Sequence, residues 1–308
     1  MEGGNDDDHH NRNVGDVSAS PVSNVYETGS SLDMYLGLHY PLSGEKEGIP
    51  PILPHDSCPT HALRFPQRMA HLLSELLPTE QKRSGKALDI GCAVGGSAFE
   101  LAKDFKTVDA FDFSELFITA ARRMQESLDE KSANQVTFGI PLEGELYQTV
   151  SACREKDMTS SIASRVAFFT GDACQIPTMI ESGQLSPPYQ GILLSNLLCR
   201  LPNPKACLDG LSLLVEPGSI VLLVTPFSWL AEFTPHSHWL GGYYTGTNKN
   251  KDSSHPTNQA VYSKPVLEEL MQSRGFELIH EQDVPLIIRE HQRKYQYIVS
   301  QATAWRKC

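Results

Sequence analysis

The sequence has no cluster of basic residues and no apolar run long enough to cross a membrane. Its 26 lysines and arginines are outnumbered by 37 aspartates and glutamates, for a formal net charge of −11. Because nucleic-acid binding relies on clustered cations that neutralise phosphates, this balance disfavours a nucleic-acid substrate. A spanning helix needs about 20 consecutive apolar residues, so no membrane partner is expected.

Closely spaced cysteine pairs are also missing. The seven cysteines form no Cys-x-x-Cys pair and no framework spacing. Disulfide scaffolds and structural metal sites have characteristic spacings, so reduced thiols, no metal site and a cytoplasmic location are expected. Residues 1–20 lack the apolar core of a signal peptide, which supports the same expectation.

Composition divides the chain into three parts. Residues 1–24 are polar and acidic, and a disordered tail is expected there. Residues 25–80 hold two amphipathic stretches, 30–40 and 65–77, which predict a helical cap for substrate and cofactor. In residues 81–308 short apolar runs alternate with helical patterns, which predicts an α/β domain with helices on both faces of a mostly parallel sheet.

Seven strands are predicted in this domain, at 87–90, 107–111, 166–170, 191–196, 219–225, 277–284 and 295–304. Two segments between them exceed the usual loop length. Residues 131–164 are interpreted as a surface elaboration. Residues 226–262 follow the carboxyl end of the predicted strand 219–225 and contain Trp229 and Trp239. Since open α/β sheets bind ligands at that edge, residues 226–262 are predicted to form an aromatic substrate lid.

The stretch Ala87–Leu101 joins a short apolar run to a helical pattern through a glycine turn. Gly91 and Gly95 let the backbone turn tightly and lie close to a ligand. The spacing is G-x-x-x-G-G, whereas dinucleotide sites use G-x-G-x-x-G. Asp89, two residues before the first glycine, would repel a pyrophosphate but suits an ammonium or sulfonium group.

This loop resembles motif I of the class I S-adenosylmethionine-dependent methyltransferases. The resemblance implies a Rossmann-like fold with S-adenosylmethionine as cofactor and S-adenosylhomocysteine as product. It also implies that Asp89 orders the loop or meets the methionine end of the cofactor. A generic strand–helix turn with spare glycines and a dinucleotide oxidoreductase remain as weaker readings.

Further polar residues follow the other predicted strands. Asp112 ends the second strand, 23 residues after Asp89, where an acid can accept both ribose hydroxyls. Its alternative role is to cap the next helix, although Ser114 already offers a capping oxygen. Asp172 follows the third strand and can accept from the adenine amine. The remaining residues predicted to contact the cofactor are Cys92, Phe113, Ala173, Asn196 and Arg64.

Other segments narrow the resemblance to the methyltransferases of ovothiol biosynthesis, which methylate an imidazole nitrogen of 5-thiohistidine. The similar segments are 26–40, 64–68, 196–207, 225–230, 239–242 and 288–297. The resemblance covers the chain from about Tyr26 to Arg306 and implies N-methylation of 5-thiohistidine. In many species of that family an iron-dependent sulfoxide synthase with an H-x₃-H-x-E motif precedes the methyltransferase. That motif is absent from this sequence, so functional coupling to a separate synthase is expected.

Methyl transfer from a sulfonium is an in-line displacement, in which positioning supplies up to roughly 7–11 kcal/mol. A general base is helpful but not obligatory, and the candidates are Glu290, His291, Tyr40 and His39. Arginine suits the substrate carboxylate, so Arg200 and Arg289 are expected to bind it, each with a structural ion pair as the alternative. Other residues expected near the substrate are His39, Trp229, Trp239 and Tyr295. For the two tryptophans the favoured alternative is packing within the lid, and for His291 it is a structural role.

Two alternatives keep the cofactor and change the function. The chain could methylate another small imidazole or thiol metabolite. It could also be a non-catalytic cofactor-binding partner of a sulfoxide synthase. The sequence leaves both open, because the glycine loop carries no information about the acceptor.

Overall fold

The computed structural model describes residues 24–40, 59–127, 136–153, 157–245, 259–291 and 293–308. The predicted disordered tail, residues 1–24, lies outside this part of the chain except for its last residue. Within the described residues, no helix has the length and apolar character needed to cross a membrane.

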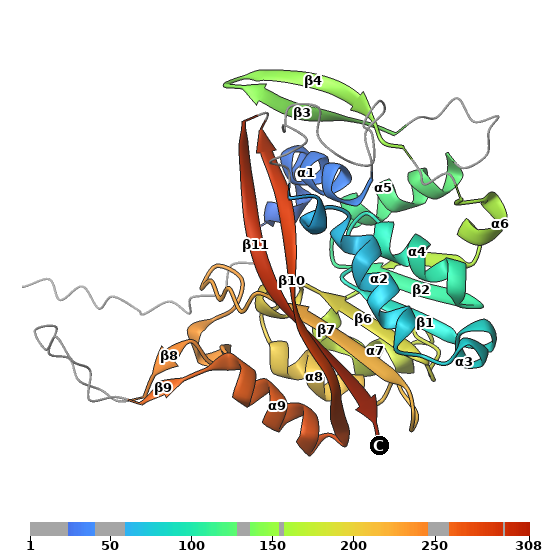
Figure 1. The fold of residues 1–308 in the computed structure, drawn as a ribbon, viewed down its shortest axis with the longest axis vertical. Helices are drawn as coiled ribbons and strands as arrows, with labels where there is room; N and C mark the ends of the chain where they lie inside the picture. The colour runs from blue at the N-terminus through green and yellow to red at the C-terminus, as the bar shows by residue number, and fades with distance from the viewer. Residues whose placement is uncertain (1–23, 41–58, 128–135, 154–156, 246–258, 292) are drawn as a thin grey trace, which may run out of the picture.

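One sheet of seven strands forms the centre of the fold (Figure 1). Its strands are β1 (Lys86–Ile90), β2 (Thr107–Asp112), β5 (Val166–Thr170), β6 (Gly191–Ser195), β7 (Ile220–Thr225), β10 (Phe276–His291) and β11 (Lys294–Lys307). Their spatial order is β10-β11-β7-β6-β1-β2-β5, and only β11 runs antiparallel to its neighbours. The predicted α/β class with a mostly parallel seven-stranded sheet is confirmed.

The strand order creates a switch point between β1 and β6. The chain runs outward from β1 through β2 to β5, then returns to build β6 on the other side of β1. Ile90 is level with Phe111 of β2 and Leu194 of β6, so these strands end together. The loops that follow them therefore emerge at one edge, where open α/β sheets bind ligands.

Nine α-helices and five short 3-10 helices lie among the described residues. The α-helices are α1 (Gly29–His39), α2 (Phe65–Glu75), α3 (Thr79–Ser84), α4 (Gly96–Asp104), α5 (Glu115–Glu126), α6 (Ser160–Ala163), α7 (Ile176–Glu181), α8 (Pro204–Leu211) and α9 (Ser263–Ser273). The 3-10 helices are η1 (Asn24–Glu27), η2 (Thr60–Ala62), η3 (Ala173–Gln175), η4 (Leu198–Arg200) and η5 (His236–His238).

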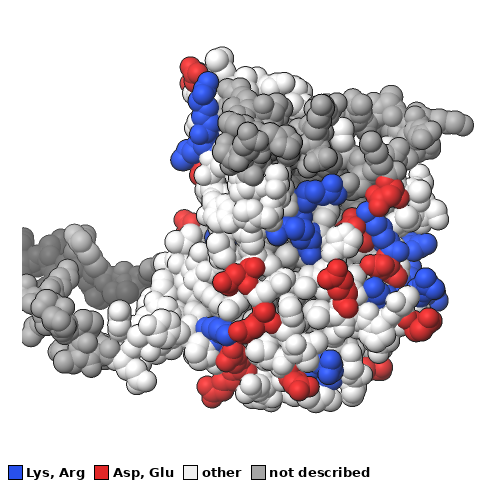
Figure 2. All heavy atoms as spheres, in the orientation of Figure 1, with Lys and Arg blue, Asp and Glu red and all other residues white. Residues whose placement is uncertain are grey.

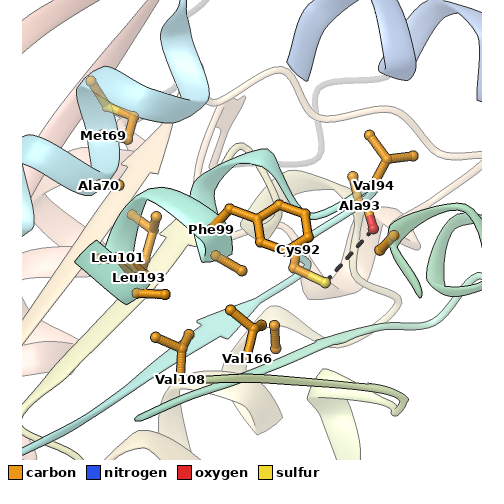
Figure 3. Close-up of a cluster of buried hydrophobic side chains, with 14 of the residues drawn as sticks. Met69, Ala70, Cys92, Ala93, Val94, Phe99, Leu101, Val108, Val166 and Leu193 are labelled. Carbon is orange, nitrogen blue, oxygen red and sulfur yellow. Dashed lines mark hydrogen bonds between the residues drawn. The ribbon is translucent and has the colours of Figure 1, made fainter. Parts of the chain in front are cut away.

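The sheet has a hydrophobic core on each face, because successive strand residues point to opposite sides. Ala87 and Leu193 join one core with apolar residues of α2, α4 and α5. Figure 3 shows part of it, with Phe99 of α4 above Val108 and Val166. The neighbouring strand residues contribute to a second core with α7, α8 and α9. Helices thus cover both faces, as predicted.

The two C-terminal strands are longer than predicted and form a hairpin that leaves the sheet. β10 and β11 remain paired as far as His291 and Lys294, where the sequence pattern predicted strands of 277–284 and 295–304. In Figure 1 the outer half of this hairpin rises above the sheet toward α1. It is held there by apolar residues such as Leu286, which is buried in the core beside α2.

The segment 131–164 contains a second hairpin, β3 (Thr137–Glu143) paired with β4 (Leu146–Ser151). Phe138 and Ile140 of β3 are buried, whereas Leu146 and Tyr147 are exposed. Figure 1 shows this hairpin across the top of α1 and the long C-terminal hairpin. The described residues 136–153 therefore form a hairpin that packs on α1, which goes beyond the predicted surface elaboration.

The predicted lid, 226–262, contains the short pair β8 (Tyr243–Tyr244) and β9 (Ala260–Val261). Its residues 246–258 lie outside the described part.

On the face seen in Figure 2, lysines and arginines are interspersed with acidic residues over broad uncharged areas.

Candidate active site

The loop between β1 and α4 requires glycine at two positions. Gly91 has φ of +76° and Gly95 has φ of +89°, a conformation that side chains rarely adopt. A Cβ on Gly91 would lie 2.9 Å from the Leu197 side chain, and one on Gly95 would lie 2.7 Å from the Phe168 ring. The predicted glycine turn is present, and it forms a close backbone cradle at the switch point of the sheet.

Asp89, on β1, links the strand before the glycine loop to the helix after it. Its side chain is 1% exposed, and its Oδ2 accepts a hydrogen bond of 2.6 Å from the Ser97 hydroxyl on α4. Burial raises the pKa of Asp89 to about 7. Of the two roles expected for this acid, ordering the loop is the one that these contacts support.

Asp112 connects the first two loops of the sheet edge. Its Oδ2 accepts from the Ala93 N–H at 2.9 Å, and its Oδ1 accepts from the Ser114 N–H at 2.9 Å. Burial raises the pKa of Asp112 to about 6. The Phe113 N–H is a third backbone donor to this carboxylate, so of its roughly four acceptor sites one remains for a ligand hydroxyl.

The other predicted cofactor residues gather at the same edge. Phe113 follows Asp112 and is 72% exposed, while Cys92 and Ala173 are buried. Asp172 follows β5 and accepts from the Cys174 N–H at 2.8 Å. Asn196 follows β6 with φ of +54°, and its Oδ1 accepts from Ser300 of β11 at 2.8 Å.

Arg200 belongs to a polar cluster that the sequence reasoning did not identify as a whole. It donates to the Ser228 carbonyl at 2.8 Å and lies over the Phe233 ring at 4.9 Å. Tyr26 lies within electrostatic range of the Arg200 guanidinium, and its ring packs edge-on against that of Tyr35 with centroids 6.1 Å apart. Burial raises the pKa of both tyrosines. They therefore remain protonated hydrogen-bond donors at neutral pH.

This cluster lies close to the β2 loop. The Ser114 hydroxyl donates to the Tyr26 carbonyl at 3.1 Å, and the Asp112 carboxylate acts electrostatically on both tyrosines. The N-terminal cap thus closes over the same edge that carries the glycine loop. The only signal in the sequence was a pair of tyrosines within the predicted cap.

Two of the candidate bases are used to hold the glycine loop. His39 Nδ1 accepts from the Gly96 N–H at 3.1 Å, and burial lowers the pKa of this imidazole to about 3. The Tyr40 hydroxyl donates to the Val94 carbonyl at 2.5 Å. Both side chains thereby dock α1 onto the loop, and His39 is neutral at physiological pH.

The other two candidate bases lie at the tip of the long hairpin. Glu290 is paired with Lys294 at 2.5 Å and accepts from Gln296 at 2.6 Å, and these contacts lower its pKa. His291 Nδ1 accepts from the Arg293 N–H at 3.2 Å. The structure does not bring this pair, or Arg289 and Tyr295 beside it, to the glycine loop.

The two lid tryptophans are packed into their own segment. Trp229 is 8% exposed and donates to Ser263 at 2.8 Å, while Trp239 donates to the Thr234 carbonyl at 2.8 Å. Their rings stack with centroids 6.5 Å apart.

Arg64, which was predicted to contact the cofactor, lies at the start of α2 with φ of +55° and acts electrostatically on Asp157.

A family model described as "Methyltransferase domain" matches residues 61–281. That range includes β1, β2, β5, β6 and β7, the loops that follow them, and α2 of the N-terminal cap, but not η1 or α1. Among curated proteins no sequence matches the chain.

Several solved structures are similar to this chain at low sequence identity. A SAM-dependent methyltransferase of Methanosarcina mazei is 16% identical over 77% of this chain and 96% of its own, with a TM-score of 0.43. The magnesium protoporphyrin IX methyltransferase of Synechocystis PCC 6803 with bound SAM is 13% identical over 79% and 82%, with a TM-score of 0.42. The [4+2]-cyclase SpnF is 12% identical over 91% and 97%, with a TM-score of 0.48.

Proposed function

The chain belongs to the methyltransferase domain family, and from this membership we propose an S-adenosylmethionine-dependent N-methyltransferase that acts on 5-thiohistidine. The methylated atom in this proposal is the ring nitrogen nearest the side chain, and the reaction is the last step of ovothiol A biosynthesis. The observation that carries the proposal is the Asp112 carboxylate, which joins the glycine loop to the β2 loop and keeps an acceptor site beside its three backbone donors.

The residues at the sheet edge fit the cofactor. Gly91 and Gly95 keep the turn of the loop tight, because a Cβ at either position would collide with Leu197 or Phe168. The remaining acceptor site of Asp112 suits a ribose hydroxyl, and Phe113 and Asp172 offer an exposed ring and an acceptor for adenine. S-adenosylmethionine is the cofactor, and when bound it supplies an electrophilic methyl group.

The Arg200 cluster is the best candidate for the amino-acid end of the acceptor. A guanidinium beside two protonated tyrosine hydroxyls offers several donors to a carboxylate. Asn196, fixed by Ser300, lies at the end of β6 on the same edge. These side chains orient the acceptor, and orientation is the main requirement of an in-line displacement.

No proton needs to leave the ring in the transition state when the acceptor enters as a thiolate. Its negative charge raises the electron density of the imidazole, so a lone pair is available without a base. His39 and Tyr40 are therefore assigned to holding the loop. Glu290 and His291 have no assigned role in the transfer.

The choice of acceptor is supported by the family resemblance of segments 196–207, 225–230, 239–242 and 288–297. A functional link to an iron-dependent sulfoxide synthase follows from the same resemblance. A reducing, cytoplasmic setting is supported by the six described cysteines, all of which are free.

Incubation of the purified chain with S-adenosylmethionine and reduced 5-thiohistidine tests the proposal. We expect a product heavier by one methyl group, together with S-adenosylhomocysteine, by mass spectrometry. Histidine, histamine and homocysteine serve as competing acceptors, and preferred turnover of any of them would replace the proposed substrate. Cofactor binding without transfer to any acceptor would instead favour a non-catalytic partner of the synthase.

A further inference from the structure

A cavity of about 330 Å³ lies between three elements that are far apart in the sequence. They are α1, the β3–β4 hairpin and the tip of the β10–β11 hairpin, which meet at the top of Figure 1. The lining includes Asp33, Gly37, Phe138, Tyr147, Arg289 and Tyr295. Its volume falls within the range typical of small-molecule pockets.

Helix α1 separates this cavity from the glycine loop. One face of the helix carries Tyr35 and His39, which contact the Phe117 ring and the Gly96 N–H. The opposite face carries Asp33 and Gly37, which line the cavity. Residues 33 and 37 share a face, whereas residues 35 and 39 lie roughly half a turn away. The cavity is therefore distinct from the candidate active site.

The cavity wall carries both signs of charge. Asp33 is partly buried, and its carboxylate accepts from the Gly139 backbone N–H. Facing it from β10, Arg289 has a buried Nε–H with no hydrogen-bond partner. Glu290 is already engaged by Lys294 and Gln296, so it offers less to a ligand.

The remaining wall is apolar and aromatic. Phe138 is 4% exposed, and the rings of Tyr147 and Tyr295 complete the lining. A ligand that satisfies this wall needs a flat apolar body, a carboxylate for the guanidinium and an ammonium for the carboxylate. The three features together describe an α-amino acid with an aromatic side chain.

We propose that this cavity is a second small-molecule site, specific for aromatic α-amino acids. Arg289 binds the carboxylate, Asp33 binds the ammonium, and the body lies against Phe138 and the two tyrosines. The site requires neither the cofactor nor methyl transfer, so it does not rest on the proposed function. It also gives the β3–β4 hairpin a role, because this hairpin supplies one wall.

Calorimetry on the full chain without cofactor tests the site, with L-tyrosine as the probe. We expect saturable binding of L-tyrosine, and at least a tenfold loss for tyramine and for 3-(4-hydroxyphenyl)propionate, which each lack one charge. Arg289→Gln and Asp33→Asn should each weaken L-tyrosine binding at least tenfold. The matched control Arg200→Gln, on the other side of α1, should leave it unchanged.

A cavity-filling variant keeps the test decisive if a charge variant fails to fold. Gly37 is exposed on α1, and a Cβ there meets only the Phe138 ring at 3.6 Å. Gly37→Leu should therefore fold, as shown by an unchanged circular dichroism spectrum, and should abolish L-tyrosine binding. The proposal is overturned if L-tyrosine does not bind, if Gly37→Leu binds it normally, or if only Arg200→Gln loses it.

Discussion

At the scale of single residues, two buried carboxyls dominate the site. Burial raises the pKa of Asp89 to about 7 and that of Asp112 to about 6. Both acids lie beside the glycine loop, and their hydrogen bonds hold that loop to α4 and to the β2 loop. Their charge state therefore affects both folding and ligand binding.

Replacement of Asp89 by asparagine should change the pH dependence of stability. The unfolded chain loses this proton near the ordinary pKa of 3.8, whereas the folded chain keeps it up to about pH 7. The unfolded state thus binds fewer protons in this window, and the free energy of unfolding falls as pH rises. At about 1.36 kcal/mol per pKa unit, this group contributes a loss of about 4 kcal/mol.

Urea unfolding of the wild type and Asp89→Asn at several pH values between about 4 and 7 measures this effect. The wild type should lose stability relative to the variant as pH rises through the window. A constant difference between the two proteins would show that Asp89 ionises normally in the folded chain.

Substitutions of Arg200 and Arg289, the two arginines expected to bind substrate, should have different effects on KM. Arg200→Met should raise KM for 5-thiohistidine by about tenfold or more, equivalent to roughly 1.4 kcal/mol or more. Arg289→Met, in the cavity beyond α1, should leave that KM within about twofold. Steady-state rates at saturating cofactor give both KM values. Equal effects of the two substitutions would contradict the assignment of Arg200 to the substrate site and of Arg289 to the separate cavity.

The position of a residue in the fold could be predicted where it depends on one local constraint, whereas contacts with the cofactor stay predictions. Asp89, Gly91 and Asp112 could be identified because a strand end and a tight turn limit what can stand there. The Tyr26–Tyr35–Arg200 cluster could not be found, because it joins two parts of the chain about 170 residues apart. No local pattern carries that information.

At the scale of elements, helix α5 and the N-terminal cap share one serine. The Ser114 hydroxyl accepts from the Phe117 N–H at 3.1 Å and donates to the Tyr26 carbonyl. The predicted cap of this helix is confirmed. Its second bond, to η1, ties the cap to the loop that holds Asp112.

Ser114→Ala should destabilise the protein by roughly 0.5–2 kcal/mol through the lost cap. It should also weaken cofactor binding, because η1 loses its bond beside Asp112. Thr159→Ala is a matched control, since Thr159 caps the short helix α6 away from the site. Chemical denaturation and calorimetry of both variants test this, and an equal effect on cofactor affinity would contradict it.

The two hairpins show why element lengths were harder to predict. Val284, Leu286 and Ile288 pack on one core, but Pro285 and Ile287 between them interrupt the polar alternation that would have predicted a longer β10. The segment 131–164 has an alternation at Phe138 and Ile140, but its long polar flanks favoured a loop. Both hairpins are stabilised by contacts with α1, which are tertiary and invisible to a local pattern.

At the scale of the whole molecule, the topology places the site. The alternation of strands and helices was enough to predict a parallel sheet with covered faces, because buried parallel strands are nearly continuous apolar runs. The sequence could not show that α1 divides the carboxyl edge from a second cavity. As a result Arg289 and Glu290 were expected at the active site, but they line the cavity on the other side of the helix.

The position of Asp112 at the carboxyl edge of the sheet predicts how cofactor binding depends on pH. Ribose hydroxyls donate to an ionised carboxylate, so affinity is present above the pKa of Asp112 and is lost as pH falls through about 6. Calorimetric titrations at about pH 5, 6 and 7.5 should show affinity rising with pH. An Asp112→Asn variant should bind weakly at all three values, and a flat profile in the wild type would contradict this role.

The most direct test of the central claim is calorimetric titration of the chain with S-adenosylhomocysteine at about pH 7.5. We expect one saturable site for this ligand, an affinity at least tenfold weaker in Asp112→Ala, and no binding of NAD. Wild-type affinity in Asp112→Ala, or tighter binding of NAD than of S-adenosylhomocysteine, would contradict it.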